Sequence, residues 1–269
     1  MRVLTLNLWA LGGDWPTRRR ALLVGLAELE PDILCLQESI VLDRYDQARD
    51  LLGDGFHLHH QARRAPDGMG VSLASRWPFR RTEELDLRLT ERSRRPPTGD
   101  FPAGALLAEV EAAPEIGPVV IVNHFPSYQV EFEHERELQA VVVARAVEEF
   151  ARGAVRHVVV AGDLDADPAS ASIRFWTGRQ SLEELSVCYR DAWESIHPGE
   201  PGETFTPRNP LVSAPDWPFR RIDYVLVRCA EQGSPSLAIS DCRLAFDEQI
   251  EGAWASDHFG VLAELLPRR

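Results

Sequence analysis

Short apolar segments, many of them followed directly by Asn, Glu, His or Asp, recur along the chain and constrain its fold more than any other feature. Runs of four to eight apolar and β-branched residues bounded by polar or turn residues are typical of buried strands. The expected strands are Val3–Leu8, Ile33–Leu36, Met69–Ser75, Gly104–Val110, Val119–Val122, His157–Ala161, Ile222–Val227 and Phe259–Leu265. The sequence therefore predicts β-sheet from one end of the chain to the other.

Helical patterns lie between these strands. Pro16 suits a first helical position, and a stripe of leucines follows it until Pro31 ends the helix. Further helices are expected over Asp43–Leu52 and over Phe132–Phe150, while Thr90–Pro102 and Pro198–Pro218 are expected to be loops. Because no repeat or linker divides the chain, we expect one α/β-type domain over residues 1–269, with packed sheets and helices outside.

The composition excludes some classes of function. The chain has 269 residues, 44% of them hydrophobic and 26% charged, as in ordinary globular proteins. Its formal net charge of −13 argues against tight, sequence-independent binding of nucleic acid, which rests on cationic side chains. The four cysteines show no CxxC spacing, so a zinc knuckle is not expected. We expect reduced thiols, with Cys35 buried.

The sequence also gives an expectation about location. No segment approaches the roughly 20 apolar residues of a membrane span. Met1 and Arg2 lead directly into the first expected strand, without the apolar core and cleavage site of a secretory leader. We therefore expect a cytoplasmic protein, and a monomer.

The polar residues near the strand ends form the candidate site. They are Asn7, Glu38, His124, Asp163, Asp165, Asp223, Asp257 and His258. Side chains at strand ends can be held rigidly while the loops around them vary. Each residue alone has an ordinary interpretation, such as a turn cap, a solvated strand end or a core histidine. The weight of the prediction rests on their combination.

The donor atoms of this set indicate which cation it suits. Carboxylates and an Asn side chain supply the oxygen ligands that Mg²⁺ or Mn²⁺ prefers, whereas zinc would require more His or Cys. A cation at such a site offsets the negative charge of a phosphate ester. The residues themselves therefore indicate a site for a hard divalent cation, which would leave room for a substrate phosphate and water.

The order of these residues resembles the endonuclease/exonuclease/phosphatase superfamily, also called deoxyribonuclease-I-like. The matching segments are Thr5-Leu6-Asn7, Leu36-Gln37-Glu38, Gly70 to Arg76, Asn123-His124, Gly162-Asp163-Leu164-Asp165, Arg221-Ile222-Asp223-Tyr224 and Ser256-Asp257-His258. They run from residue 5 to residue 258, nearly the whole chain. The resemblance implies an α/β (α+β) four-layer sandwich, two packed central β-sheets flanked by helices, with the site at one edge.

The resemblance also implies a role for each matched residue. Glu38 would be the principal metal ligand, assisted by Asn7 and Asp257. His258 would be the general acid/base or a phosphate contact, oriented by Asp223. The resemblance further implies that Asp163 positions or deprotonates the attacking water, and that His124 faces the phosphoryl oxygens.

One position departs from the family pattern. The family usually has Gly-Asp-x-Asn where this chain has Gly162-Asp163-Leu164-Asp165. An Asn could donate an N–H to a phosphoryl oxygen, and an ionised Asp cannot. Asp165 could bind a second divalent cation, stay protonated, or matter less here; we favour the second cation.

The expected activity is divalent-metal-dependent hydrolysis of a phosphomonoester or phosphodiester, on a small or soluble substrate. The alternative is a nuclease acting on DNA or RNA, including an abasic-site enzyme. His124 disfavours the abasic-site branch, which tends to have Tyr in this role; Tyr128 follows Pro126 and is no clean replacement. We expect the Trp residues to be core rather than base-stacking platforms. An inactive binding module of the same fold is a third interpretation.

A pair of polar residues on the helix after His124 has two interpretations. Arg136 and Gln139 lie one turn apart and could face the mouth of a cleft. A solvated helix face is the favoured interpretation.

Overall fold

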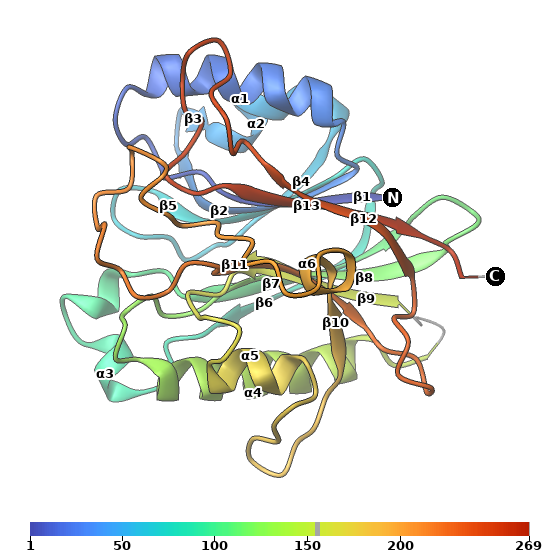
Figure 1. Ribbon diagram of the computed structural model, residues 1–269. Coiled ribbons are helices and arrows are strands. Elements are labelled where there is room, and N and C mark those ends of the chain that lie inside the picture. The colour runs from blue at the N-terminus through green and yellow to red at the C-terminus, as the bar shows by residue number, and fades with distance from the viewer. Residues whose placement is uncertain (154–156, 269) are drawn as a thin grey trace.

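The computed structural model describes residues 1–153 and 157–268 as two stacked β-sheets with helices on both outer faces (Figure 1). One sheet has the strand order β12-β13-β1-β2-β5-β4, with β3 paired to β2, and the other has the order β10-β11-β9-β8-β7-β6. The strands are β1 (Arg2–Asn7), β2 (Ile33–Leu42), β3 (Tyr45–Asp46), β4 (His57–His60), β5 (Met69–Ser75), β6 (Phe79–Asp86), β7 (Gly104–Glu111), β8 (Pro118–Phe125), β9 (His157–Asp163), β10 (Tyr189–Asp191), β11 (Asp223–Arg228), β12 (Ala238–Ala245) and β13 (Gly260–Leu266).

Helices form the two outer layers. Helices α1 and α2 lie over the first sheet, and α4 and α5 lie over the second (Figure 1). The helices are α1 (Trp15–Leu29), α2 (Gln47–Leu52), α3 (Glu91–Arg94), α4 (Glu133–Phe150), α5 (Ala171–Trp176) and α6 (Ala192–Ile196), with short 3-10 turns η1 (Gly53–Gly55) and η2 (Thr98–Asp100). This arrangement confirms the expected four-layer sandwich.

The core divides into three apolar clusters that follow these layers. The cluster between the sheets includes Cys35, Val71, Ile121 and Val159, all fully buried. A second cluster packs α4 and α5 against their sheet, and a third packs α1 and α2 against the other. Burying both faces of each sheet explains why the central strands are apolar runs rather than alternating patterns.

Strand pairing brings the candidate residues together. The strands β1 and β2 are parallel, with Asn7 opposite Gln37, so their carboxyl ends meet at one edge of the sheet. In the other sheet β11 pairs antiparallel with β9, and Asp223 lies directly opposite Asp163. The last residue of β1 and the two aspartates therefore face one another where the sheets meet.

Several predicted boundaries were wrong. The strand expected to end before Glu38 continues to Leu42, so Glu38 lies inside β2, and the strand expected to end at Val122 continues to Phe125, so His124 lies inside β8. The expected loop over Thr90–Pro102 contains α3 and η2. The missed strand β6 lies at a sheet edge and is largely exposed, so it carries charged residues instead of an apolar run.

Among the residues that the structure describes, no helix is long and apolar enough to cross a membrane.

Candidate active site

Asn7, the last residue of β1, connects the two sheets. Its Nδ2 donates to Glu38 Oε1 at 3.2 Å and to Asp163 Oδ2 at 3.0 Å, and its Oδ1 accepts from the backbone N–H of Trp9 at 2.9 Å. Asn7 is buried, so these bonds fix its rotamer. The predicted ligand Asn7 therefore also orients two carboxylates.

Glu38 is presented by a bulge in β2. The register of β2 against β5 shifts between Leu36 and Ser39, and Glu38 has the left-handed φ of 52°. A non-glycine residue in this region carries strain that the surrounding structure must hold. Gln37 supplies part of that support, because its buried Nε2 donates to Asn123 Oδ1 at 2.7 Å on the opposite sheet. The bulge turns the Glu38 side chain toward the edge where β1 ends.

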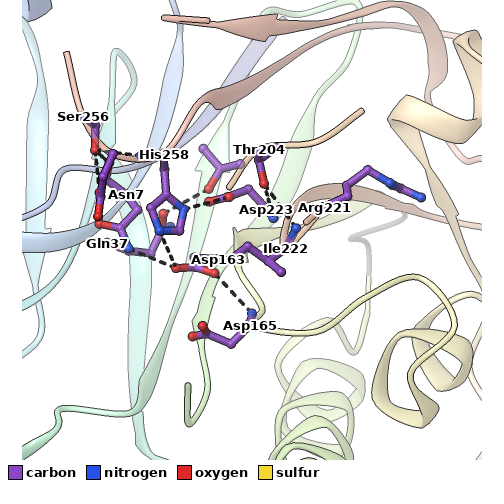
Figure 2. Close-up of polar contacts among 12 residues, drawn as sticks. Asn7, Gln37, Asp163, Asp165, Thr204, Arg221, Ile222, Asp223, Ser256 and His258 are labelled. Carbon is purple, nitrogen blue, oxygen red and sulfur yellow. Dashed lines mark hydrogen bonds and ion pairs between the residues drawn. The ribbon is translucent and has the colours of Figure 1, made fainter. Parts of the chain in front are cut away.

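His258 lies between two buried aspartates (Figure 2). Its Nδ1 lies 3.0 Å from Asp223 Oδ2, and its Nε2 lies 3.9 Å from Asp163 Oδ2. Burial alone would lower the pKa of His258, but the charges of Asp223 and Asp163 outweigh it and raise the pKa well above the usual value. The arrangement holds the imidazole in one orientation with Nε2 directed at Asp163.

Asp163 ends β9 after a required glycine. A Cβ on Gly162 would lie 1.9 Å from the carbonyl oxygen of His124 on the neighbouring strand, so only glycine fits there. Burial, together with the charge of Asp223, raises the pKa of Asp163 to about 7. Its Oδ1 accepts from the backbone N–H of Asp165 at 3.2 Å (Figure 2).

Asp165 has a left-handed φ of 49°, a conformation that Asp and Asn adopt more readily than most residues. The side chain is buried, and its Oδ2 has no hydrogen-bond partner among the described residues. Burial and the nearby charge of Asp163 raise the pKa of Asp165 well above the usual value. An unpaired buried carboxylate oxygen is costly unless a cation or a proton satisfies it.

Asp257 completes the group from the segment before β13. Burial raises the pKa of its carboxyl, while His258 opposes the shift. The charge of Asp257 in turn adds to burial in raising the pKa of Glu38. The two carboxylates are therefore close enough to repel each other, as expected of ligands that a shared cation would hold.

Five of the predicted residues, Glu38, Asp163, Asp165, Asp257 and His258, border one cavity of about 400 Å³, whereas Asn7 and Asp223 contact these residues without lining it. It is lined by Glu38, Met69, Phe101, Phe125, Tyr128, Asp163, Asp165, Phe205, Ala214, Trp217, Ile222, Asp257 and His258. A larger hollow of about 890 Å³ beside His60 and Arg64 is open, and none of the predicted site residues lines it. The smaller cavity is therefore the candidate active site. Trp217 lies in its wall, contrary to the expectation that the Trp residues belong to the core.

Three supporting residues were not predicted. Thr204 Oγ1 accepts from the backbone N–H groups of Ile222 and Asp223, each at 3.2 Å. Ser256 Oγ donates to the carbonyl oxygen of Asn7 at 2.7 Å. The guanidinium of the buried Arg18 donates to five carbonyl oxygens in the segments that follow Asn7 and precede Asp257. Ser256 stood in a recognised motif, whereas Thr204 and Arg18 gave no local sequence signal.

His124 lies apart from this group. Its ring packs against Trp176 of α5, with ring centroids 5.9 Å apart, and it does not line the cavity. Neither ring nitrogen has a hydrogen-bond partner among the described residues, and burial lowers the pKa of His124 to about 3. This geometry does not support the predicted contact between His124 and a phosphoryl group.

His124 should make the protein less stable in acid. Between pH 6.5 and 3 the unfolded chain binds a proton on this ring and the folded protein does not, so stability falls as the pH falls. Urea unfolding at pH 7 and pH 5 measures the effect. Between these two pH values the free energy of unfolding should fall by about 2 kcal/mol more in the wild type than in His124→Phe. His134→Gln, at an exposed histidine of α4, is the control. Equal losses in the wild type and His124→Phe would contradict a buried neutral His124.

Arg136 and Gln139 do not form a solvated helix face, so that expectation was wrong. Both are buried. Arg136 donates to the carbonyl oxygens of Ser127, Gln129 and Val130 and pairs with Glu133. Gln139 accepts from the backbone N–H of Ser127 at 3.0 Å. They hold the segment after β8, which carries Tyr128 into the cavity wall.

Comparisons with known sequences and solved structures agree on the family and the fold of the chain. A profile of the endonuclease/exonuclease/phosphatase family matches residues 4–258. A Caenorhabditis elegans protein that carries the name of a candidate neutral sphingomyelinase is 27% identical over 304 aligned residues, which cover 98% of this chain and 66% of that protein. The chain thus spans slightly less than two thirds of that relative.

The solved structures show the same fold at low sequence identity. D. rerio TDP2, solved with a single-strand DNA product, has a TM-score of 0.73 and 20% identity, with 98% of this chain and 97% of that chain covered. The human Nocturnin catalytic domain, solved with a bound sulfate anion, has a TM-score of 0.71 and 17% identity, with 98% and 94% covered. With a family match over 4–258 and this fold, the chain belongs to the endonuclease/exonuclease/phosphatase family.

Proposed function

We propose that the chain hydrolyses a phosphomonoester or phosphodiester by metal-assisted attack of water in this cavity. Membership of the family supports a phosphoester hydrolase in general terms. The observation that carries the finer proposal is the His258 ring, held between Asp223 and Asp163 on the wall of a cavity that Glu38 and Asp257 also line. An inactive binding module would have no need of this arrangement.

The residues fit a hard divalent cation. Four carboxyl groups line the cavity, and among its described lining residues there is no arginine or lysine to offset them. Glu38 and Asp257 would hold Mg²⁺ or Mn²⁺ through carboxylate oxygens. Asn7 would assist by orienting Glu38, because its Nδ2 donates to that carboxylate and its Oδ1 accepts from the Trp9 N–H. Bound there, the cation would neutralise charge on the phosphate.

A second group of possible ligands is Asp163, Asp223 and His258, whose ligand atoms lie within 4.8 Å of one another. We assign these residues to proton transfer instead. Asp223 already engages Nδ1 of His258, which leaves Nε2 to contact the phosphate or to protonate the leaving oxygen. Asp163, which Asn7 orients, would position the attacking water or accept its proton.

A substrate panel tests the proposal. Nucleotides, sugar and inositol phosphates, lipid phosphodiesters and plasmid DNA are incubated with the protein and Mg²⁺ or Mn²⁺, and released phosphate or alcohol is measured. We expect turnover of at least one small phosphate ester. Turnover of plasmid DNA alone would favour the nuclease alternative, and binding of esters without turnover would favour the inactive module.

We further propose that Asp165 contributes to a second cation site, since the residue lines the cavity and its buried Oδ2 lacks a partner among the described residues. Asp165→Asn removes one charge and keeps the shape of the side chain. Isothermal titration with Mn²⁺ should then show fewer bound ions or an affinity roughly tenfold lower, a loss of the size seen when one supporting residue of a metal site is removed. An unchanged titration would favour a protonated Asp165 instead.

A further inference from the structure

The cavity has aromatic walls in addition to its carboxylate cluster. Beside the carboxylates, its lining includes five aromatic side chains, namely Phe101, Phe125, Tyr128, Phe205 and Trp217. Phe101 packs against Phe125 and Tyr128, with ring centroids 4.8 Å and 5.0 Å apart. Phe205 packs against the His258 ring itself at 4.9 Å. Aromatic rings therefore lie both in the cavity wall and directly against His258 at its reactive end.

Two of these rings are partly open to solvent. Tyr128 is 44% exposed, and Trp217 is partly exposed on the segment between α6 and β11. Neither is needed to fill the core, whereas the buried Phe125 is. Exposed aromatic side chains that gather at a cavity are typical of ligand contacts, because their flat faces offer apolar area at low entropic cost.

Three buried arginines around the site are already engaged, and no arginine is among the described residues that line the cavity. The chain contains no lysine, so arginine is its only permanently cationic side chain. Arg18 is committed to backbone carbonyls and Arg136 to carbonyls and Glu133. Arg221 is paired with Asp191. Apart from the proposed divalent cations, the described lining offers no cationic side chain for further phosphates, so the cavity suits one phosphate on an otherwise uncharged molecule.

We infer that the aromatic wall is a binding subsite for a flat, uncharged aromatic group esterified to the phosphate, and that Tyr128 and Trp217 determine this specificity. The inference rests on the proposed phosphoesterase function and names its substrate class. A cavity of about 400 Å³ has room for one phosphate and one ring system. The rings then stack on the substrate while the carboxylate end of the cavity takes the phosphate.

Binding of phosphonates tests the subsite without relying on turnover. Phenylphosphonate, hexylphosphonate and methylphosphonate carry the same anionic group and differ only in the attached group. Isothermal titration with Mg²⁺ present should show that phenylphosphonate binds ten- to a hundredfold more tightly than methylphosphonate, as expected for stacking on aromatic side chains. Hexylphosphonate should fall well below phenylphosphonate.

Variants of Tyr128 and Trp217 test whether these two residues cause the preference for phenylphosphonate. Tyr128→Ala and Trp217→Ala should each reduce the phenyl-to-methyl ratio several-fold, and the double variant should bring it close to one. Tyr128→Phe keeps the ring and should keep the ratio. Val130→Ala is the matched control, because Val130 is exposed, apolar and two residues from Tyr128 but does not line the cavity. Circular dichroism confirms that each variant folds.

The outcomes separate the two proposals. Equal binding of phenyl- and methylphosphonate, with hydrolysis of small esters intact, would overturn the aromatic subsite and leave the phosphoesterase proposal standing. Tighter binding of hexylphosphonate than of phenylphosphonate would overturn it in favour of an aliphatic chain. Tighter binding of a single-stranded oligonucleotide than of phenylphosphonate would overturn it in favour of a polyanion. No hydrolysis of any ester would overturn the proposed function itself.

Discussion

Asp223→Asn is expected to lower kcat for bis-p-nitrophenyl phosphate by on the order of 10²- to 10⁴-fold. Asp223 accepts from Nδ1 of His258 at 3.0 Å, and both side chains are buried. The neutral amide keeps the size of the carboxylate but removes the charge that stabilises the protonated imidazole. It can also donate to Nδ1, which would favour the wrong tautomer. Steady-state kinetics with saturating Mg²⁺ measures the effect.

The double variant tests whether the two residues act as one unit. If Asp223 acts only through His258, Asp223→Asn combined with His258→Ala should be no slower than His258→Ala alone, because effects within a unit are not additive. Titration with Mn²⁺ should change little in Asp223→Asn, since Asp223 is assigned to the histidine and not to the cation. A loss of kcat in the double variant equal to the product of the two single-variant losses would contradict the assignment of Asp223 to His258.

Glu38→Gln is expected to weaken binding of the divalent cation by about 100-fold or more. At Mg²⁺ concentrations on the order of 10⁻³ M, the variant should therefore lose most of its turnover. The substitution removes one negative charge while the bulge in β2 keeps the side chain at the same place. Asn7 can still donate to the amide oxygen, so the rest of the site should hold its geometry. Isothermal titration and activity measured against Mg²⁺ concentration report the two effects.

Asp67→Asn is the matched control for Glu38→Gln. Asp67 is an exposed carboxylate that contributes to the raised pKa of Glu38 but does not line the cavity. Asp67→Asn changes the net charge of the protein by the same amount as Glu38→Gln. If Asp67→Asn weakened the cation as much as Glu38→Gln, the effect would come from the general field of the protein, and Glu38 would not be a ligand.

The sequence predicted the layers and most of the residues at the cavity, and the reasons are local. Apolar runs identify buried strands, and a polar residue beside such a run marks a strand end, as for Asn7 and Asp163. The order of those motifs then matched the family. Glu38 was found in the same way, but nothing local predicted the bulge and the left-handed φ that present it.

His124 shows how a small error in a boundary changes a residue's role. The expected strand stopped at Val122, and the observed strand continues to Phe125. Successive residues of a strand point to opposite faces. Asn123 bonds across to Ser72 on the other sheet and Phe125 joins the core between the sheets, so His124 points outward to Trp176.

The aromatic wall could not have been predicted from local pattern. Phe205 and Trp217 belong to the Pro- and Gly-rich segment between α6 and β11, which has no periodicity, and only the tertiary fold brings them to the same cavity as Tyr128. Arg136 and Gln139 were misread because a polar residue on a helix is usually solvated. Here the helix packs against a segment whose carbonyl oxygens require donors.

The most direct test of the account is hydrolysis of bis-p-nitrophenyl phosphate by protein first stripped with EDTA. We expect no release of p-nitrophenolate after stripping, recovery when Mg²⁺ or Mn²⁺ is added, and no recovery in Glu38→Ala or His258→Ala. Turnover that persists in EDTA, or that both variants retain at the wild-type level, would contradict a metal-dependent site built on Glu38 and His258.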